Sequence, residues 1–346
     1  MANKKMIVPH NKLSIGQEEM LAAKKVLESG WLAQGAEVSA FENDFCDFLG
    51  LKHGHAVALS SCSVAIYLSL IALGSQDKTV AMPVYVSRVL KGATKLSNGK
   101  AIFLDTKSGS PNIDIDIVRR LSPDILIAPH MFGIPIDLRG LDNIDVIENC
   151  AHSLGGKVGS VSIGLQGKIG VYSFQATKLM TSGGMGGMLV SKDHLLINWV
   201  RNYRDFDENK DIGHNLNFKM SDIQAAIGRV QLKKLPLWIE KRERIFNIYK
   251  NAGLELLDVD VSERSYVKPV RYRAVVQTRN AEKCIKFLYD KGFKSIIPIE
   301  RWELLSNDPA YANAINLTGR TISLPIYPEL KESHAAEIAF LLNGKL

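Results

Sequence analysis

One lysine stands where a lysine side chain can do covalent chemistry. Lys178 comes shortly after an apolar run at 171–174 and before a glycine-rich turn at 183–187. A lysine carried into a pocket by a strand can be desolvated, which lowers its pKa. The deprotonated amine can then attack an aldehyde and form a Schiff base. Most lysines are solvated surface residues, so this position alone is a weak signal.

A second segment has the residue types of an anion site. Ser60-Ser61-Cys62-Ser63 joins an apolar run at 55–60 to a helical pattern at 62–73. Small residues at such a junction let backbone N–H groups approach a phosphate at the positive end of a helix. The same pattern also fits an ordinary helix N-cap. A third segment, from Asn149 to His152, places polar groups at the end of another apolar run.

The elements that must position these segments alternate along the chain. A first helix is expected from Ser14 and Gln17 as a capping box and Gly30 as its end, and a second presents Phe41, Phe45 and Phe48 on one face. Strands are predicted at 55–60, 79–84, 101–105, 124–129, 145–149, 171–174 and 187–191. The alternation indicates a mostly parallel sheet covered on both faces, and such sheets bind ligands at the carboxyl ends of their strands.

The second half of the chain has a different pattern. A long helix is predicted from Ser221, interrupted at Pro236 and resuming through Tyr249. Strands at 267–276 and 295–298 then mix with helices at 281–292 and 333–342. The sequence therefore predicts a large domain at 1–235 and a smaller C-terminal α+β domain at 236–346.

Composition excludes several classes of protein. The 346 residues are 46% hydrophobic and 23% charged, with no apolar stretch long enough for a membrane span and no apolar leader, so a cytoplasmic protein is expected. The four cysteines are far apart and His53 with His55 is the only close histidine pair, so neither a disulfide framework nor a metal site is expected. The net charge of +7 is scattered, which favours an anionic substrate or cofactor, or a solvated surface, over nucleic acid.

Taken together, these segments resemble the DegT/DnrJ/EryC1/StrS family of pyridoxal-phosphate enzymes, chiefly sugar aminotransferases. The resemblance covers residues 10–250 well, and beyond them only fragments match. In chain order the matching motifs are Gly30-Trp-Leu-Ala-Gln-Gly35, Ser61-Cys62-Ser63, Glu148-Asn149-Cys-Ala-His152, Ser173-Phe-Gln-Ala-Thr-Lys178 and Asn217-Phe-Lys-Met-Ser-Asp222 with Gln224-Ala-Ala226. It implies the α/β fold of the fold type I pyridoxal-phosphate transferases, with helices flanking a mostly parallel central sheet.

The resemblance also implies roles for individual residues. Lys178 is expected to hold pyridoxal 5′-phosphate as a Schiff base and to serve as the catalytic base. Ser63 and Ser173, with the backbone around Cys62, are expected to bind its phosphate, and His152 is expected near the ring oxygen O3′. Asn217 is expected to reach the phosphate of a neighbouring subunit, which implies a homodimer with shared active sites.

Three positions depart from the family pattern around the ring. Asn149 stands where the family has an aspartate facing the pyridine nitrogen. A carboxylate keeps that nitrogen protonated through a charge-assisted hydrogen bond, worth about 1.5–3 kcal/mol against about 1 kcal/mol for a neutral one. Ser87 stands where relatives place an aromatic that stacks on the ring, and Tyr85 is the candidate to compensate. Lys219 replaces an arginine, which keeps the charge without the bidentate geometry.

The expected function is amino transfer from an amino acid, by analogy glutamate, to an anionic keto sugar, expected to be nucleotide-linked and to serve bacterial surface polysaccharide. Two alternatives stay open: another reaction class, such as a sugar dehydratase, or a cofactor-binding protein with weakened or no activity. The retained Lys178 argues against the first alternative. The glycine turn at 183–187 lacks the family's glutamate and carries one extra residue, and this departure at 184–185, with those at 149 and 87, supports the second alternative. Cations that can meet an anionic substrate, or be plain solvated charges, are Lys12, Arg88, Lys219 and Arg301.

Overall fold

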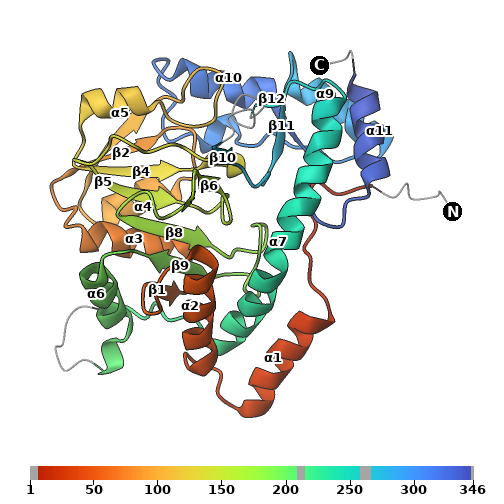
Figure 1. Ribbon diagram of the computed structural model, residues 1–346. Coiled ribbons are helices and arrows are strands. Elements are labelled where there is room, and N and C mark those ends of the chain that lie inside the picture. The colour runs from red at the N-terminus through yellow and green to blue at the C-terminus, as the bar shows by residue number, and fades with distance from the viewer. Residues whose placement is uncertain (1–6, 209–214, 258–265, 344–346) are drawn as a thin grey trace.

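A seven-stranded sheet forms the centre of the molecule (Figure 1). The computed structural model describes residues 7–208, 215–257 and 266–343. The strands are β1 (Ala56–Leu59), β2 (Thr79–Pro83), β3 (Lys100–Leu104), β4 (Ile125–Pro129), β5 (Asp145–Asn149), β8 (Ile169–Ser173) and β9 (Gly187–Val190), in the spatial order β1-β9-β8-β5-β4-β2-β3. Within this sheet β9 alone is antiparallel to its neighbours. The predicted mostly parallel α/β sheet is therefore confirmed.

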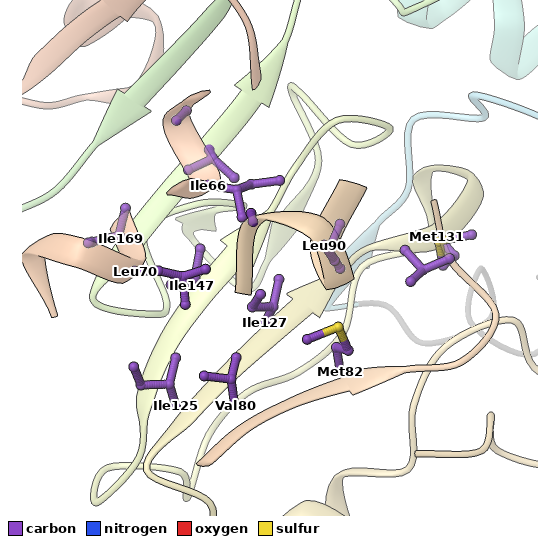
Figure 2. Close-up of a cluster of buried hydrophobic side chains, with 14 of the residues drawn as sticks. Ile66, Leu70, Val80, Met82, Leu90, Ile125, Ile127, Met131, Ile147 and Ile169 are labelled. Carbon is purple, nitrogen blue, oxygen red and sulfur yellow. The ribbon is translucent and has the colours of Figure 1, made fainter. Parts of the chain in front are cut away.

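Most residues of the central strands are apolar because both faces of the sheet are covered. Side chains alternate between the faces, so Ile125 and Ile127 of β4 lie in one hydrophobic cluster while Leu126 and Ala128 lie in another. The first cluster includes Ile66 and Leu70 of α3 (Cys62–Ala72) and Leu90 of α4 (Val89–Leu96), packed over β2, β4, β5 and β8 (Figure 2). Burying one such side chain fully contributes about 1.5–3 kcal/mol, which fixes α3 on the sheet.

Aromatic side chains fix a second helix on the sheet. On α2 (Ala36–Leu49), Phe41 and Phe45 are fully buried, whereas Phe48 is only partly covered. The Phe41 ring centroid lies 5.2 Å from that of Phe174, the residue after β8. The Phe45 ring centroid lies 4.9 Å from that of Tyr172, near the end of β8. The phenylalanine face predicted for this helix therefore holds the strand that leads to Lys178.

The first helix begins two residues later than its expected capping box requires. Helix α1 (Gln17–Ser29) has Gly16 as its N-cap, and the Glu19 carboxylate accepts the Gly16 N–H at 2.8 Å. The hydroxyl of Ser14 instead donates to the Glu329 carboxylate at 2.6 Å, so the predicted Ser14 cap was wrong. Gly30 ends the helix at a φ of 73°, where glycine is favoured, as predicted.

The long helix α7 (Asp222–Asn251) continues through Pro236, so the predicted interruption was wrong. A proline removes one helical hydrogen bond, but Leu235 and Trp238 beside it are buried, and that packing holds the helix together. In Figure 1 α7 runs from beside α1 and α2 to beside α9 and α11. The predicted domain boundary at 235/236 falls inside this helix, and the two-domain division stays a prediction.

The C-terminal part has its own hydrophobic cluster, which includes Ile245, Phe246 and Tyr249 from the end of α7. Its elements are β11 (Ala274–Gln277), α9 (Ala281–Lys291), α10 (Ala312–Arg320), β12 (Thr321–Leu324) and α11 (Glu332–Leu342). The predicted strand at 267–276 is instead two short strands, β10 (Val267–Lys268) and β11, and 295–298 contributes only an isolated bridge between Ile296 and Ser323.

Short elements complete the described part of the chain. Strands β6 (Lys157–Val158) and β7 (Val161–Ser162) pair with β10 in a small sheet, and α5 (Ile115–Leu121) and α6 (His194–Arg204) are helices that the sequence patterns did not identify. None of the described helices is both long and apolar enough to span a membrane.

Candidate active site

A cavity of about 350 Å³ opens at the carboxyl edge of the parallel strands. The segments that follow β1, β2, β4, β5 and β8 all contribute to its wall, as expected for a sheet of this kind. Its lining includes Ser61, Cys62, Ser63, Ser87, Phe132, Asn149, His152, Ser173, Gln175, Lys178, Gly186, Tyr272, Arg273 and Glu303. The structure thus brings together most of the site residues predicted from separate motifs.

The start of α3 forms one end of this wall. The Ser61 hydroxyl accepts the Val64 N–H at 3.3 Å and so caps the helix, while Cys62 and Ser63 lie in its first turn. Burial raises the pKa of the Cys62 thiol to about 12, so this side chain is neutral at physiological pH. Free N–H groups and hydroxyls at a helix N-terminus favour a bound anion. Ser173, at the end of β8, lines the same cavity.

Lys178 follows the end of β8 by five residues and lines the cavity. Its backbone N–H donates to the Gln175 carbonyl at 2.9 Å in a tight turn, and its Nζ atom lies 5.4 Å from the centroid of the Tyr272 ring. Burial alone raises the pKa of Tyr272, but the positive charges of Lys178 and Arg273 together bring it below its usual value. The cavity is therefore electrically positive around Lys178.

His152 is held as a neutral ring. It stacks on Tyr272 with centroids 4.2 Å apart, and burial, with the charges of Lys178 and Arg273, holds its pKa well below the usual value. Its Nδ1 atom accepts the Phe132 N–H at 3.4 Å, which leaves Nε2 to carry the ring proton. His152 can thus donate a hydrogen bond from Nε2 at physiological pH.

Asn149 closes the wall at the end of β5 and is 8% exposed. Its side-chain oxygen accepts the Ala151 N–H at 3.2 Å. This local contact occupies the acceptor of the amide, so the side chain's remaining hydrogen-bonding capacity is chiefly its NH₂ donor.

Behind the cavity wall, a buried acid anchors the end of β5. The Glu148 carboxylate accepts backbone N–H groups of Gly164 at 2.9 Å and Gly167 at 2.6 Å, and lies 3.0 Å from His130 Nε2. Among the described residues, Glu148, His130 and Cys150 form the one cluster with metal-ligand spacing. The His130 Nδ1 atom accepts the Ile136 N–H at 2.9 Å, so both ring nitrogens already have protein partners. The cluster serves as a hydrogen-bonded support for Asn149.

Two of the predicted cofactor residues lie away from the cavity. Tyr85 is fully buried in the core beside Phe132, with the rings edge to face at 6.1 Å, and it is not part of the lining. It therefore does not take the place of a stacking aromatic, whereas Ser87 does line the cavity. Asn217 is exposed and lies outside the cavity of its own chain, where its side-chain oxygen accepts the Lys219 N–H at 3.2 Å.

The four cations proposed from the sequence all lie outside the lining. Lys219 pairs with Asp207 at 2.5 Å, Arg88 donates to the Trp302 carbonyl, and Arg301 donates to Asn307 at 3.0 Å. Lys12 lines a second, very small pocket, to which Lys178 also contributes. The cation that does line the cavity besides Lys178 is Arg273, which the sequence patterns did not single out. The available signal was the pair of arginines that flank Tyr272 inside the strand predicted at 267–276.

Phe132 is another residue missed from the sequence. It has a φ of 58°, a left-handed conformation that side chains rarely adopt, and it lines the cavity beside His152. Such strain often marks a functional site.

Residues of the 217–226 motif support the site from outside. The Asp222 carboxylate accepts three backbone N–H groups at the start of α2, those of Gly35 at 2.8 Å, Val38 at 3.0 Å and Glu37 at 3.2 Å. The Gln224 amide donates to the Met185 carbonyl at 3.0 Å, in the glycine-rich turn. The motif thus ties α2 and that turn to the start of α7.

Comparison with known proteins agrees with this arrangement. The DegT/DnrJ/EryC1/StrS aminotransferase family matches residues 13–342. The spore coat polysaccharide biosynthesis protein SpsC of Bacillus subtilis is 27% identical, with 96% of this chain and 95% of that protein covered. GDP-perosamine synthase of Escherichia coli O157:H7 is 26% identical, with 97% and 98% covered. The crystal structure of the aminotransferase TlmJ from Streptoalloteichus hindustanus has a TM-score of 0.88 at 24% identity, with 98% of both chains covered.

Proposed function

The chain belongs to the DegT/DnrJ/EryC1/StrS aminotransferase family, and from this premise we propose that it moves an amino group from an amino acid, with glutamate as the expected donor, to a nucleotide-linked keto sugar. It is a pyridoxal 5′-phosphate-dependent aminotransferase. The names of GDP-perosamine synthase and of the spore coat polysaccharide protein support a nucleotide-linked acceptor and a destination in surface polysaccharide.

The observation that carries this proposal is the single cavity shared by Lys178, the N-terminus of α3 and His152. Its donor set fits the cofactor group by group. The first turn of α3, with Ser63 and Ser173, offers N–H and hydroxyl donors for a phosphate. The Nε2–H of His152 suits a ring oxygen, and the amide of Asn149 suits a pyridine nitrogen. A volume of about 350 Å³ is in the range of small-molecule sites.

The side chains then have distinct tasks. Pyridoxal phosphate supplies an aldehyde that takes up the amino group and a ring that withdraws electrons from the adjacent carbon. Lys178 would hold the cofactor covalently through Nζ. Once free, the same atom would take the proton from the amino-bearing carbon and return it. Phe132, His152 and Tyr272 supply the aromatic faces of the cavity and would exclude water from Nζ.

Asn149 sets the strength of this chemistry. Because its oxygen accepts the Ala151 N–H, its NH₂ group is the part available to a ring nitrogen, and an amide N–H favours an unprotonated nitrogen. The loss of one pKa unit at that nitrogen corresponds to about 1.4 kcal/mol. This contact favours a second candidate function, in which the chain binds the same cofactor but catalyses slower or altered chemistry.

A homodimer with shared active sites is part of the proposal. Asn217 is exposed and outside the cavity of its own chain, which suits a residue that acts in a neighbouring subunit. Apolar side chains on and after α1 are also uncovered, with Met20 53%, Leu27 58% and Trp31 62% exposed. Exposed apolar groups gathered in this way favour contact with another protein surface. Light scattering behind a sizing column tests the dimer.

Absorption spectroscopy tests the proposed function. The purified protein should carry the absorption of a lysine-bound cofactor, and glutamate should convert it to the amino form. A nucleotide-linked keto sugar should then restore the original spectrum. Lys178→Ala should lose the conversion, while His53→Gln, at an exposed histidine that pairs with Asp47 and does not line the cavity, should keep it. A wild-type protein that binds no cofactor, or whose spectrum ignores every amino acid supplied, contradicts the proposal.

A further inference from the structure

Arg273 places a second positive charge in the cavity wall. Its guanidinium carbon lies 5.3 Å from the centroid of the Tyr272 ring, the ring that also lies 5.4 Å from the Nζ atom of Lys178. The two cations are therefore separated by no more than these two distances combined. Arg273 directly follows Tyr272 and leads into β11, so a strand of the C-terminal part fixes it against the site.

Within the described part of the chain, Arg273 has only neutral partners. Its Nη1 atom lies 3.3 Å from the Nε2 atom of His10 and 3.5 Å from the Ser323 hydroxyl. Its Nε atom is buried and has no hydrogen-bond partner among those residues. Burial lowers the pKa of His10 to about 3, so the ring beside the guanidinium is itself uncharged. Nothing in this surrounding neutralises the arginine.

Arg273 is part-buried, and the three buried arginines of the described chain all have oxygen partners, although the Nε atom of Arg242 also lacks one. Arg204 pairs with Glu42 and Asp205, and the neighbouring Arg271 pairs with Glu243 at 2.8 Å. Arg242 is surrounded by carbonyl oxygens instead, the shortest contact being 2.8 Å to Ile326. A charge partly withdrawn from water without a charged partner is destabilised and favours a bound counter-ion. The arrangement around Arg273 is therefore that of a site completed by an anion from outside.

Glu303 is the one carboxylate among the described residues that line the cavity. Its Oε2 atom accepts the Glu300 N–H at 2.8 Å, and no ion pair joins it to Arg273 in the described structure. Burial is the main cause that lowers the pKa of His152, and the charges of Lys178 and Arg273 lower it further; the same two charges lower the pKa of Tyr272 against the effect of burial. The positive potential in the cavity is thus a property of this pair of cations.

We propose that Arg273 binds the α-carboxylate of the amino donor, holding it beside Lys178. This inference rests on the proposed function. The α-carboxylate is attached to the carbon that carries the amino group, so its partner must lie near the reacting lysine. The phosphates of a nucleotide-linked sugar lie several bonds further from the reacting carbon. A planar guanidinium also matches a carboxylate with two parallel hydrogen bonds.

Donor binding to the holoenzyme tests the assignment. Arg273→Gln should weaken the apparent dissociation constant for glutamate about 10- to 100-fold, because a hydrogen bond to a charged group contributes about 1.5–3 kcal/mol. Arg273→Lys, which keeps the charge, should recover part of that loss. Arg301→Gln is the matched control, since this arginine contacts Asn307 outside the cavity. Calorimetric titration with the unreactive dicarboxylate glutarate should give the same order of affinities without turnover.

A second donor separates the two carboxylates of glutamate. The amine 4-aminobutanoate lacks only the α-carboxylate, so its affinity should be nearly the same in wild type and Arg273→Gln. Equal weakening of both donors, or unchanged glutamate and glutarate binding in a folded Arg273→Gln variant, overturns the assignment. Loss confined to the nucleotide-linked sugar also overturns it and reassigns Arg273 to a phosphate. A wild-type enzyme that binds glutarate but transfers no amino group contradicts the proposed function and leaves the carboxylate site standing.

Discussion

Gly187 packs against the backbone of Cys62 so closely that a Cβ atom on Gly187 would lie 2.5 Å from the Cys62 nitrogen. That nitrogen belongs to the first turn of α3, and Gly187 is the first residue of β9. Contacts of this kind under 3.0 Å are essentially never adopted, so a side chain here must move one of the two backbones. The relationship explains why the last residue of the glycine-rich turn at 183–187 is a glycine: it leaves room for the start of α3.

Gly187→Ala should therefore weaken cofactor binding. Displacing the first turn of α3 misdirects the N–H groups proposed to bind the phosphate, and loss of one or two such charge-assisted bonds corresponds to about a tenfold or greater loss of affinity. Titration of the apoprotein with pyridoxal phosphate measures this affinity. Gly92→Ala is the control, because a Cβ atom on Gly92 meets nothing within 4 Å. Equal affinities in the two variants would show that this cradle does not hold the phosphate.

Asn149→Asp should change the protonation of the bound cofactor. A carboxylate at this position should accept a hydrogen bond from the protonated ring nitrogen and raise its pKa, so that the nitrogen left unprotonated by the amide takes up a proton from water. The nitrogen chemical shift of cofactor labelled at that atom reports the change directly. The donor half-reaction should also quicken by about fivefold or more, since the difference between a charged and a neutral hydrogen bond is about 1 kcal/mol. A wild-type nitrogen that is already protonated would refute this account of Asn149.

Asp222→Ala should destabilise the fold without touching the cavity. The carboxylate accepts three N–H groups at the start of α2, so its removal leaves those donors without their partner and should cost about 2–3 kcal/mol. Asp193→Ala supplies the comparison, because Asp193 is an exposed N-cap of α6 and should cost about 1 kcal/mol. Chemical denaturation followed by circular dichroism gives both values. An Asp222 variant as stable as the Asp193 variant would mean that α2 needs no such cap.

His10 should make stability depend on acid pH. Its pKa falls from the usual 6.5 to about 3, because of burial first and then the charges of Arg273, Lys294 and Arg242. Between these two values the unfolded chain binds more protons, so this contribution to stability is complete above about pH 6.5 and is lost as the pH falls towards 3. Through this one group, the free energy of unfolding can change by at most about 1.4 kcal/mol per pH unit.

His10→Gln should flatten that dependence. The free energy of unfolding, measured from about pH 7 to pH 4, should fall less steeply in this variant than in the wild type, while His53→Gln on the surface keeps the wild-type slope. Parallel curves for the wild type and His10→Gln would show that the buried imidazole is not the group that titrates.

The sequence was most informative where a pattern repeats locally. Fully buried parallel strands must be apolar on both faces, so each strand of the central sheet was visible as a short apolar run. The polar residues just after those runs, such as Ser63, Asn149, His152 and Lys178, then had to meet at one edge of the sheet. Their convergence follows from topology and needs no long-range information.

Contacts between distant segments could not be predicted from the sequence. Arg273 is held by His10, 263 residues earlier in the chain, and no local pattern relates the two. Tyr85 looked like a ring-stacking residue because it follows β2, but the residues after that strand turn its side chain into the core. Pro236 was expected to break a helix on local grounds, whereas the packing of Leu235 and Trp238 decides the outcome. In each case tertiary packing outweighs the local signal.

The central claim is that Lys178 holds the cofactor. Borohydride reduction of the purified holoenzyme makes a reversible lysine–cofactor link permanent, and peptide mapping by mass spectrometry then locates it. The account predicts one phosphopyridoxyl group per chain, on the peptide that contains Lys178, and none in Lys178→Ala. Attachment to a different lysine, or an unmodified Lys178 in protein that has retained the cofactor, would contradict it.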